Sequence, residues 1–283
     1  MKPFFLPTQQ GACFCIFHAP SGPCKGGLVY VPPLGEEMNR CRRVAALQAK
    51  SLAQAGYAVL QLDLSGTGDS AGDFGQFSWD AWVQDLVAAH NWMLEFLKKS
   101  AADTALPQWF WALRGGCLLA ASAVRQLTGQ NQRTTDLLFW QPVASGSLYL
   151  TQWLRLQSAS SLVQGKAVTG TQALRQRLLA GEAAEIGGYP ISAALAIGLD
   201  ATDLNGLPSG CRVTCWFASD VAVPAVAPLV PPAFASQLAN WQVAGVQAQA
   251  FAVSAPAFWQ LQEVGDAPSL RSNTLDMFVK AGA

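Results

Sequence analysis

Short apolar segments with the composition of β-strands alternate with longer segments of helical periodicity along most of this 283-residue chain. Two of the strand-like segments, QWFWAL (108–113) and LLFWQPV (137–143), are apolar along nearly their whole length. Strands of this kind occur in parallel sheets whose two faces are both covered by helices. The alternation therefore predicts an α/β fold with a mostly parallel central sheet and helices on both faces. The predicted strands are 12–19, 27–31, 57–64, 108–113, 136–143, 211–219 and 246–253, and the predicted helices are 40–56, 79–99, 116–127, 233–245 and 269–282.

The stretch from residue 145 to residue 208 interrupts this alternation. It contains helical patches such as TQALRQRLLAGEAAEI and no clear strand. We therefore expect a helical cap, 145–208, inserted over one end of the sheet, with the core formed by 1–144 and 209–283.

The composition limits the partners of the chain. Hydrophobic residues make up 51% of it, charged residues only 13%, and the formal net charge is zero. Nucleic-acid binding needs a basic surface that neutralises phosphates, so we expect no nucleic-acid partner.

No run of about 18 apolar residues is free of helix breakers, and MKPFFLPTQQ lacks the apolar core of a signal peptide. These features predict a cytoplasmic protein, with peripheral attachment to a membrane left open.

Cysteine and histidine usage indicates no metal site. The seven cysteines contain no C-x-x-C pair, and only two histidines are present. Zinc sites need a closer grouping of such ligands, so we interpret the cysteines as buried free thiols in a reducing compartment. No cofactor is predicted.

The segment WALRGGCLLA (111–120) has the pattern of a strand, a tight glycine turn and a helix. Chains of this type often carry the motif G-x-S-x-G at such a junction, with the serine as a nucleophile on the turn. The five corresponding positions here are Ala112, Leu113, Arg114, Gly115 and Gly116. Arginine therefore occupies the position of the nucleophile.

Three features, in this order, resemble the α/β-hydrolase superfamily: the turn DLSGTGDS (63–70), the WALRGGCLLA junction, and an insertion after the sixth strand. A closer resemblance is to the α/β-hydrolase-like proteins associated with the exosortase A system, of the second type. The segments that carry it are VPPLGEEMNRCRR, DLSGTGDSAGDF, WALRGG, LLFWQPV, GYPIS and APAFWQLQEV. This resemblance implies a bacterial source and a setting of exopolysaccharide production and PEP-CTERM protein sorting, without implying a substrate.

The residues needed for acyl transfer on this fold are largely missing. A guanidinium stays protonated and cannot attack a carbonyl, so Arg114 is no nucleophile. The loop after the last strand, where the resemblance places the base histidine, reads SAPAFW (254–259), and no histidine follows His90. Asp220 matches the position of the acid but has no histidine to orient. The loop Pro32–Glu37 replaces the usual oxyanion loop, and we assign no catalytic residue.

A buried guanidinium needs a partner, because an unpaired buried charge is very costly. The loop after the strand 27–31 faces the 111–120 junction in this fold, so Arg114 should pair with Glu36 or Glu37. The pair either plugs the former active site, which we favour, or leaves Arg114 to hold a small anionic ligand such as an acidic sugar, a phosphate or a carboxylate. The candidate pocket residues are Arg114, Gly115, Glu36, Glu37, Asp220 and Trp259.

Residues 221–262 contain no charged residue and no histidine. Either the cap and the closing helix cover this stretch, or it is exposed and binds a protein or a membrane surface.

The functional prediction is an accessory or ligand-binding protein of an exosortase-linked system that lacks a Ser-His-Asp triad. The alternative is a hydrolase of an ester or acyl group that uses Asp220, Glu36 or Glu37 with water.

Overall fold

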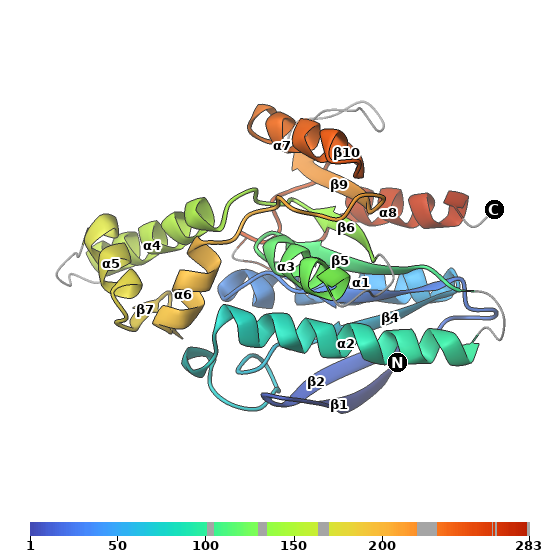
Figure 1. The fold of residues 1–283 in the computed structure, drawn as a ribbon, viewed down its shortest axis with the longest axis horizontal. Coiled ribbons are helices and arrows are strands. Elements are labelled where there is room, and N and C mark those ends of the chain that lie inside the picture. The colour runs from blue at the N-terminus through green and yellow to red at the C-terminus, as the bar shows by residue number, and fades with distance from the viewer. Residues whose placement is uncertain are drawn as a thin grey trace.

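A single eight-stranded sheet forms the centre of the molecule (Figure 1). The computed structural model describes residues 1–100, 105–129, 135–163, 170–219, 231–261, 263 and 265–281, with only the backbone for 156–163, 233 and 281. The strands run in the order β1-β2-β4-β3-β5-β6-β9-β10. Pairing is antiparallel between β1 and β2 and between β2 and β4, and parallel elsewhere. The bounds are β1 (Lys2–Thr8), β2 (Gly11–His18), β3 (Gly26–Val31), β4 (Tyr57–Leu62), β5 (Gln108–Leu113), β6 (Asp136–Trp140), β9 (Arg212–Ser219) and β10 (Gln247–Ser254).

Helices cover both faces of the sheet, as the continuous apolar strands predict. Because side chains alternate along a strand, Phe110 and Ala112 of β5 pack into one hydrophobic cluster, whereas Trp111 and Leu113 pack into the other. The first cluster includes residues of α2 (Trp79–Ser100), α3 (Gly116–Gly129) and α7 (Pro232–Val243). The second includes residues of α1 (Glu36–Gln54) and α8 (Pro268–Ala281).

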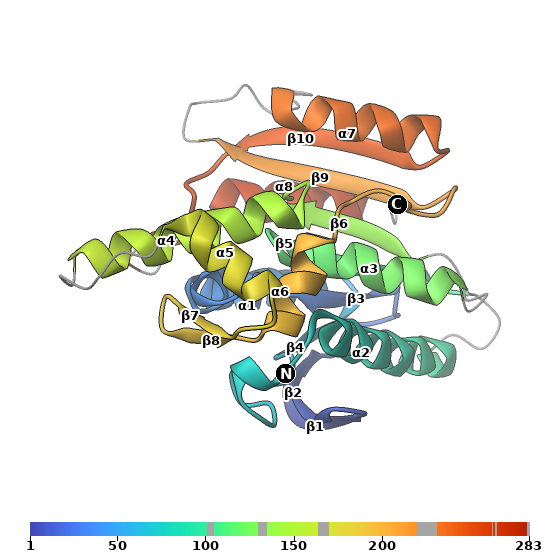
Figure 2. The ribbon, with the colours of Figure 1, turned by 60° about the vertical axis from the view of Figure 1, so that its left-hand side comes forward.

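The chain leaves the sheet after β6 and returns to it at β9. Between them it forms α4 (Gly146–Val163), α5 (Thr171–Leu179), the short hairpin β7 (Ala184–Ile186) and β8 (Tyr189–Ile191), and α6 (Ala193–Asp200). Figure 2 shows these elements grouped beside the sheet, which runs from β1 and β2 at one edge to β9 and β10 at the other. The departing and returning segments are joined, since Gly146 donates its backbone N–H to the carbonyl of Thr202 at 2.8 Å.

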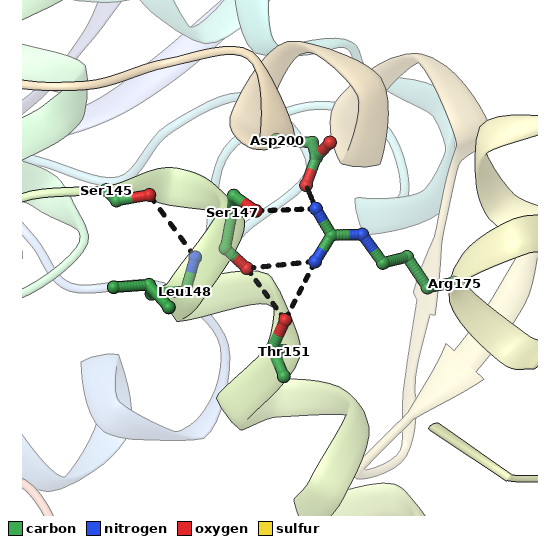
Figure 3. Close-up of polar contacts among 6 residues, drawn as sticks. All are labelled: Ser145, Ser147, Leu148, Thr151, Arg175 and Asp200. Carbon is green, nitrogen blue, oxygen red and sulfur yellow. Dashed lines mark hydrogen bonds and ion pairs between the residues drawn. The ribbon is translucent and has the colours of Figure 1, made fainter. Parts of the chain in front are cut away.

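Arg175 of α5 ties the three inserted helices together (Figure 3). Its guanidinium donates to Ser147 and Thr151 of α4, with the Thr151 hydroxyl at 2.8 Å, and forms an ion pair with Asp200 of α6. The three helices, whose apolar side chains also pack into one hydrophobic cluster, are thereby joined through one planar, multiply donating group.

Several boundaries differ from the sequence-based predictions. Helix α1 begins at Glu36 instead of residue 40, because Gly35 (φ 59°) turns the chain without the Ser, Thr, Asp or Asn cap that would signal the start. Strand β1 contains two prolines and was not predicted, but an edge strand tolerates residues without an N–H. The β7–β8 hairpin contradicts the prediction of no strand within 145–208; each strand has only three residues.

The uncharged stretch 221–262 is described only in part. Residues 221–230 and 262 lie outside the described residues, so the prediction of an exposed partner surface stays a prediction. Within 231–261 the aromatic side chains of α7 and of the turn after β10 are buried, whereas Val243 and Leu261 are exposed. Among the described residues no helix is both long and apolar enough to cross a membrane.

Candidate functional site

The strand order reverses direction at one point in the sheet. From β3 the chain crosses to β4 on one side, and β5 then lies on the other side of β3. Ligands of open parallel sheets bind at such a switch point, at the carboxyl ends of the strands. The two segments that begin there are the first turn of α1, which carries Glu37, and the turn after β5, which carries Arg114.

Arg114 forms the sharp turn between β5 and α3 in a left-handed backbone conformation, with φ at 54°. This conformation is uncommon for a residue with a side chain, and it is often found where a site requires it. Gly116 allows the turn to pack closely, because a Cβ there would lie 2.4 Å from the carbonyl oxygen of Pro32. The predicted junction of a strand, a tight turn and a helix is thus present, and the residue at the turn carries a guanidinium.

Glu37 is the carboxylate that contacts Arg114. The Nε atom of Arg114 lies 3.3 Å from Oε1 of Glu37, and both side chains are largely buried, at 11% and 17% exposed. Tyr149 of α4 donates its hydroxyl to the other oxygen, Oε2, at 2.7 Å. Burial raises the pKa of Glu37, and the neighbouring Arg114 and the Tyr149 hydrogen bond oppose that rise. Both carboxylate oxygens therefore have a partner.

The guanidinium of Arg114 is also held between two aromatic rings. Its Cζ atom lies 5.6 Å from the centroid of Tyr149 and 5.5 Å from the centroid of Trp259. Such cation–π contacts stabilise an arginine by about 0.5–2 kcal/mol. Only Nε donates a hydrogen bond to a described residue, and the two Nη atoms donate none within the described part of the chain.

A cavity of about 850 Å³ lies beside Arg114, bounded by the start of α1, by α4, and by Gly187 in the hairpin turn. The Arg114–Glu37 pair therefore does not plug the pocket, contrary to the version that we favoured. The pair lies against the wall formed by Tyr149 and Trp259, so the space in front of it stays open. Three arginines and two glutamates line the cavity: Arg40, Arg114, Arg155, Glu36 and Glu37.

The other predicted pocket residues occupy different positions. Glu36 lines the cavity but does not contact Arg114; it is half exposed and lies 3.6 Å from Arg40. Trp259 packs on Arg114, and Gly115 packs against Tyr149 so closely that a Cβ would lie 2.5 Å from the ring. Asp220 lies outside the described residues, so its predicted place in the pocket stays a prediction.

Neither histidine of the chain lies in the cavity. His18 is hydrogen-bonded through Nε2 to Gln61 at 2.9 Å, and His90 through Nε2 to the Thr135 hydroxyl at 2.8 Å. Both histidines are buried. Cys117 is fully buried in the core, as predicted. Among the described residues, no group of three His, Cys, Asp or Glu side chains is placed to hold a metal ion.

Sequence reasoning missed several cavity residues, because they come from segments far from the elbow. Tyr149 and Trp153 are on α4, within the stretch treated only as a cap, and nothing in its local pattern singles them out. Gln141 follows β6 directly. A polar residue immediately after a buried parallel strand could have been recognised in the sequence as a candidate site residue, because such positions meet at one edge of the sheet.

No family model and no curated protein matches the sequence. Solved structures do match the fold. A soluble variant of monoglyceride lipase from Saccharomyces cerevisiae, in complex with a substrate analogue, has a TM-score of 0.62 at 10% identity, covering 99% of this chain and 94% of that one.

Two further structures match over nearly the whole chain. Est1E from Butyrivibrio proteoclasticus with bound ferulic acid has a TM-score of 0.56 at 10% identity and covers 99% of this chain and 96% of that one. The α/β serine hydrolase XC6422 from Xanthomonas campestris, described as lacking a lid, has a TM-score of 0.54 at 14% identity, covering 99% and 94%. The chain has the α/β-hydrolase fold that esterases and lipases share.

Proposed function

We propose that this protein is a ligand-binding member of the α/β-hydrolase fold that holds a small anionic molecule at Arg114 and carries out no serine-hydrolase chemistry. We further propose that it acts as an accessory protein of an exosortase A system linked to exopolysaccharide production and PEP-CTERM sorting. The support for that setting is the sequence resemblance of the segments named above.

One observation carries the binding proposal: three side chains contact the Arg114 guanidinium, which still has N–H donors without a described partner. Glu37, Tyr149 and Trp259 fix its position, while its Nη atoms donate to no described residue. A guanidinium fork matches a carboxylate or a phosphate in a bidentate geometry. Helix α3 begins at Gly116, and the amino end of a helix also favours an anion.

Acyl transfer by a Ser-His-Asp triad does not fit this site. The elbow position carries an arginine, which cannot act as a nucleophile, and the chain has no histidine after His90. The two histidines present are hydrogen-bonded to Gln61 and Thr135, elsewhere in the fold.

A hydrolase that uses a carboxylate and water is the second candidate. The observation that favours it is the raised pKa of Glu37 beside a cavity, which suits a general base or acid. However, one oxygen of Glu37 faces Arg114 and the other accepts the hydrogen bond of Tyr149. An activated water would have to compete with both partners, so the geometry favours binding.

The binding proposal is tested by titrating the protein with glucuronate, inorganic phosphate and hexanoate in isothermal calorimetry. At least one of these anions should bind, and the double variant Arg114→Met/Glu37→Gln should abolish that binding. The double variant removes both charges together, so that no buried charge is left unpaired. Binding that persists in the double variant, or no binding by any of the three, contradicts the proposal.

The absence of serine-hydrolase chemistry has its own test. A fluorophosphonate probe and a series of short-chain p-nitrophenyl esters should give neither labelling nor turnover with the wild-type protein. A labelled serine would contradict the proposal outright. Turnover that is lost in Glu37→Gln without any labelled serine would favour the second candidate instead.

A further inference from the structure

Arg114 and Gln141 lie side by side at the carboxyl edge of the sheet. They follow Leu113 and Trp140, which are paired in the register of β5 and β6. Arg114 donates its backbone N–H to the carbonyl of Trp140 at 3.0 Å, and Gln141 donates to that of Trp216 at 2.7 Å. Among the described residues these are the only two non-glycine residues with positive φ, at 54° and 47°. Two neighbouring strands thus end in the same uncommon conformation.

The side-chain amide of Gln141 has a fixed orientation. The backbone N–H of Ala218 donates to Oε1 of Gln141 at 2.8 Å. A backbone N–H needs an acceptor, so the amide oxygen must be the atom on that side. The two N–H donors of Nε2 are therefore directed elsewhere, and they meet no partner among the described residues. Gln141 lines the same cavity as Arg114.

The cavity fits an organic ligand with one negative charge. Its volume of about 850 Å³ lies within the range of roughly 300–1,000 Å³ that is typical of sites for organic ligands. An inorganic ion would leave most of that space to water. Among the described residues, three arginines and two glutamates line it, with a formal charge of +1. One carboxylate on the ligand would balance that charge.

We infer that Gln141 is a specificity residue of this cavity, and that the ligand is a hydroxylated carboxylic acid. The inference rests on the proposed function of Arg114 as the anion-binding group. Arg114 binds the carboxylate, and Nε2 of Gln141 donates a hydrogen bond to a hydroxyl oxygen on a nearby carbon. Both residues line the same cavity and follow adjacent strands, whose backbones are about 4.8 Å apart, so one small molecule in that cavity can meet both groups.

The test compares two acids of equal charge. Glucuronate carries hydroxyl groups and hexanoate carries none, so the ratio of their dissociation constants reports the contribution of the hydroxyls. We expect the wild-type protein to bind glucuronate at least about tenfold more tightly than hexanoate, because a site built to hydrogen-bond a hydroxyl rejects a ligand that lacks it. Calorimetry with the 283-residue chain measures both constants.

The decisive variant is Gln141→Met. Methionine has a similar length but can neither donate a hydrogen bond to a hydroxyl nor accept one strongly from it. The loss of the acceptor for Ala218 affects both acids alike, whereas the loss of the contact to a hydroxyl weakens glucuronate alone, so the preference should fall to about threefold or less. The matched control is Gln247→Met at the amino end of β10, where the glutamine is exposed, and it should leave both constants unchanged.

The outcomes separate this inference from the proposed function. If both acids bind through Arg114 with equal affinity, or if Gln141→Met keeps the preference, the role of Gln141 is overturned while the anion site stands. If only inorganic phosphate binds, the hydroxylated acid is overturned as the ligand, and the anion site again stands. If none of the three anions binds, or if Arg114→Met/Glu37→Gln leaves binding intact, the proposed function fails as well.

Discussion

Tyr149 donates its hydroxyl to Glu37 at 2.7 Å, joining residues 112 positions apart in the chain. The bond connects the first turn of α1 with α4 and holds the carboxylate that faces Arg114. The neighbouring Glu36 has a similar partner, since Tyr189 donates to it at 3.1 Å, but that pair is exposed. The two tyrosine–glutamate pairs form the same hydrogen bond but differ in burial, so a comparison of them reports the effect of burial on its strength.

Tyr149→Phe should lower the free energy of unfolding by about 1–3 kcal/mol, because it leaves a buried carboxylate oxygen without a donor. Tyr189→Phe, which removes the same group from the exposed pair, should change it by less than about 0.5 kcal/mol. Urea denaturation of the two variants measures both values. Equal losses in the two variants would contradict a special role for the buried bond.

Gly116→Ala should destabilise the protein by about 3 kcal/mol or more, because overpacking against backbone cannot be relieved by a rotamer change. The added Cβ would lie 2.4 Å from the carbonyl oxygen of Pro32. Gly129, at the other end of the same helix, is the control, because a Cβ added there would meet no atom within 4 Å. Gly129→Ala should be neutral or stabilising by up to about 1 kcal/mol. Differential scanning calorimetry compares the two, and a tolerated Gly116→Ala would show that the turn packs less closely than described.

Arg175→Met should destabilise the inserted helices, because it removes the group that joins α4, α5 and α6 (Figure 3). We expect a loss of about 1–3 kcal/mol and faster proteolysis within that segment. Arg177 is two residues away on the same helix, and it pairs with Glu182 where both side chains are more than half exposed. Arg177→Met should therefore cost less than about 0.5 kcal/mol. Similar proteolysis rates in the two variants would refute the linking role of Arg175.

His90 should make stability depend on pH. Burial lowers its pKa from 6.5 to about 4 in the folded protein. The unfolded chain therefore binds a proton more readily between these values, so stability falls as the pH falls from about 6.5 to about 4. The full effect is about 3 kcal/mol, from roughly 1.4 kcal/mol per pKa unit.

His90→Gln removes this contribution while leaving every carboxylate in place. The difference in unfolding free energy between the wild type and the variant should thus shrink as the medium is acidified towards pH 4. Chemical denaturation at several pH values measures it. A difference that is constant over this range would show that His90 titrates with its ordinary pKa in the folded protein.

The alternation of strands and helices was predictable because β3, β5 and β6 are apolar on both faces and have no other way to be buried. Strand β5 matches its predicted bounds of 108–113. The start of α1 was not predictable, since Gly35 replaces the usual capping side chain and its φ of 59° is not visible in the sequence. The two glutamates were therefore assigned to a loop, although they lie in the first helical turn.

Part of the site followed from the sequence by physical necessity. A guanidinium on a buried turn needs an anion, and the loop after β3 offered only Glu36 and Glu37. The choice between them depends on helical geometry, which points Glu37 at Arg114 and leaves Glu36 exposed. Tyr149 and the open cavity could not be predicted, because they depend on how α4 packs over the carboxyl edge of the sheet.

The burial of Glu37 also limits which side chains the turn at residue 114 can accept. Arg114→Ser alone would place a hydroxyl on the turn but leave a buried carboxylate facing it without a cation, at a cost of about 3–5 kcal/mol. A serine there would also find no histidine after β10. Arg114→Ser would therefore need a second substitution at Glu37 to avoid that cost, and a third to place a histidine near the turn.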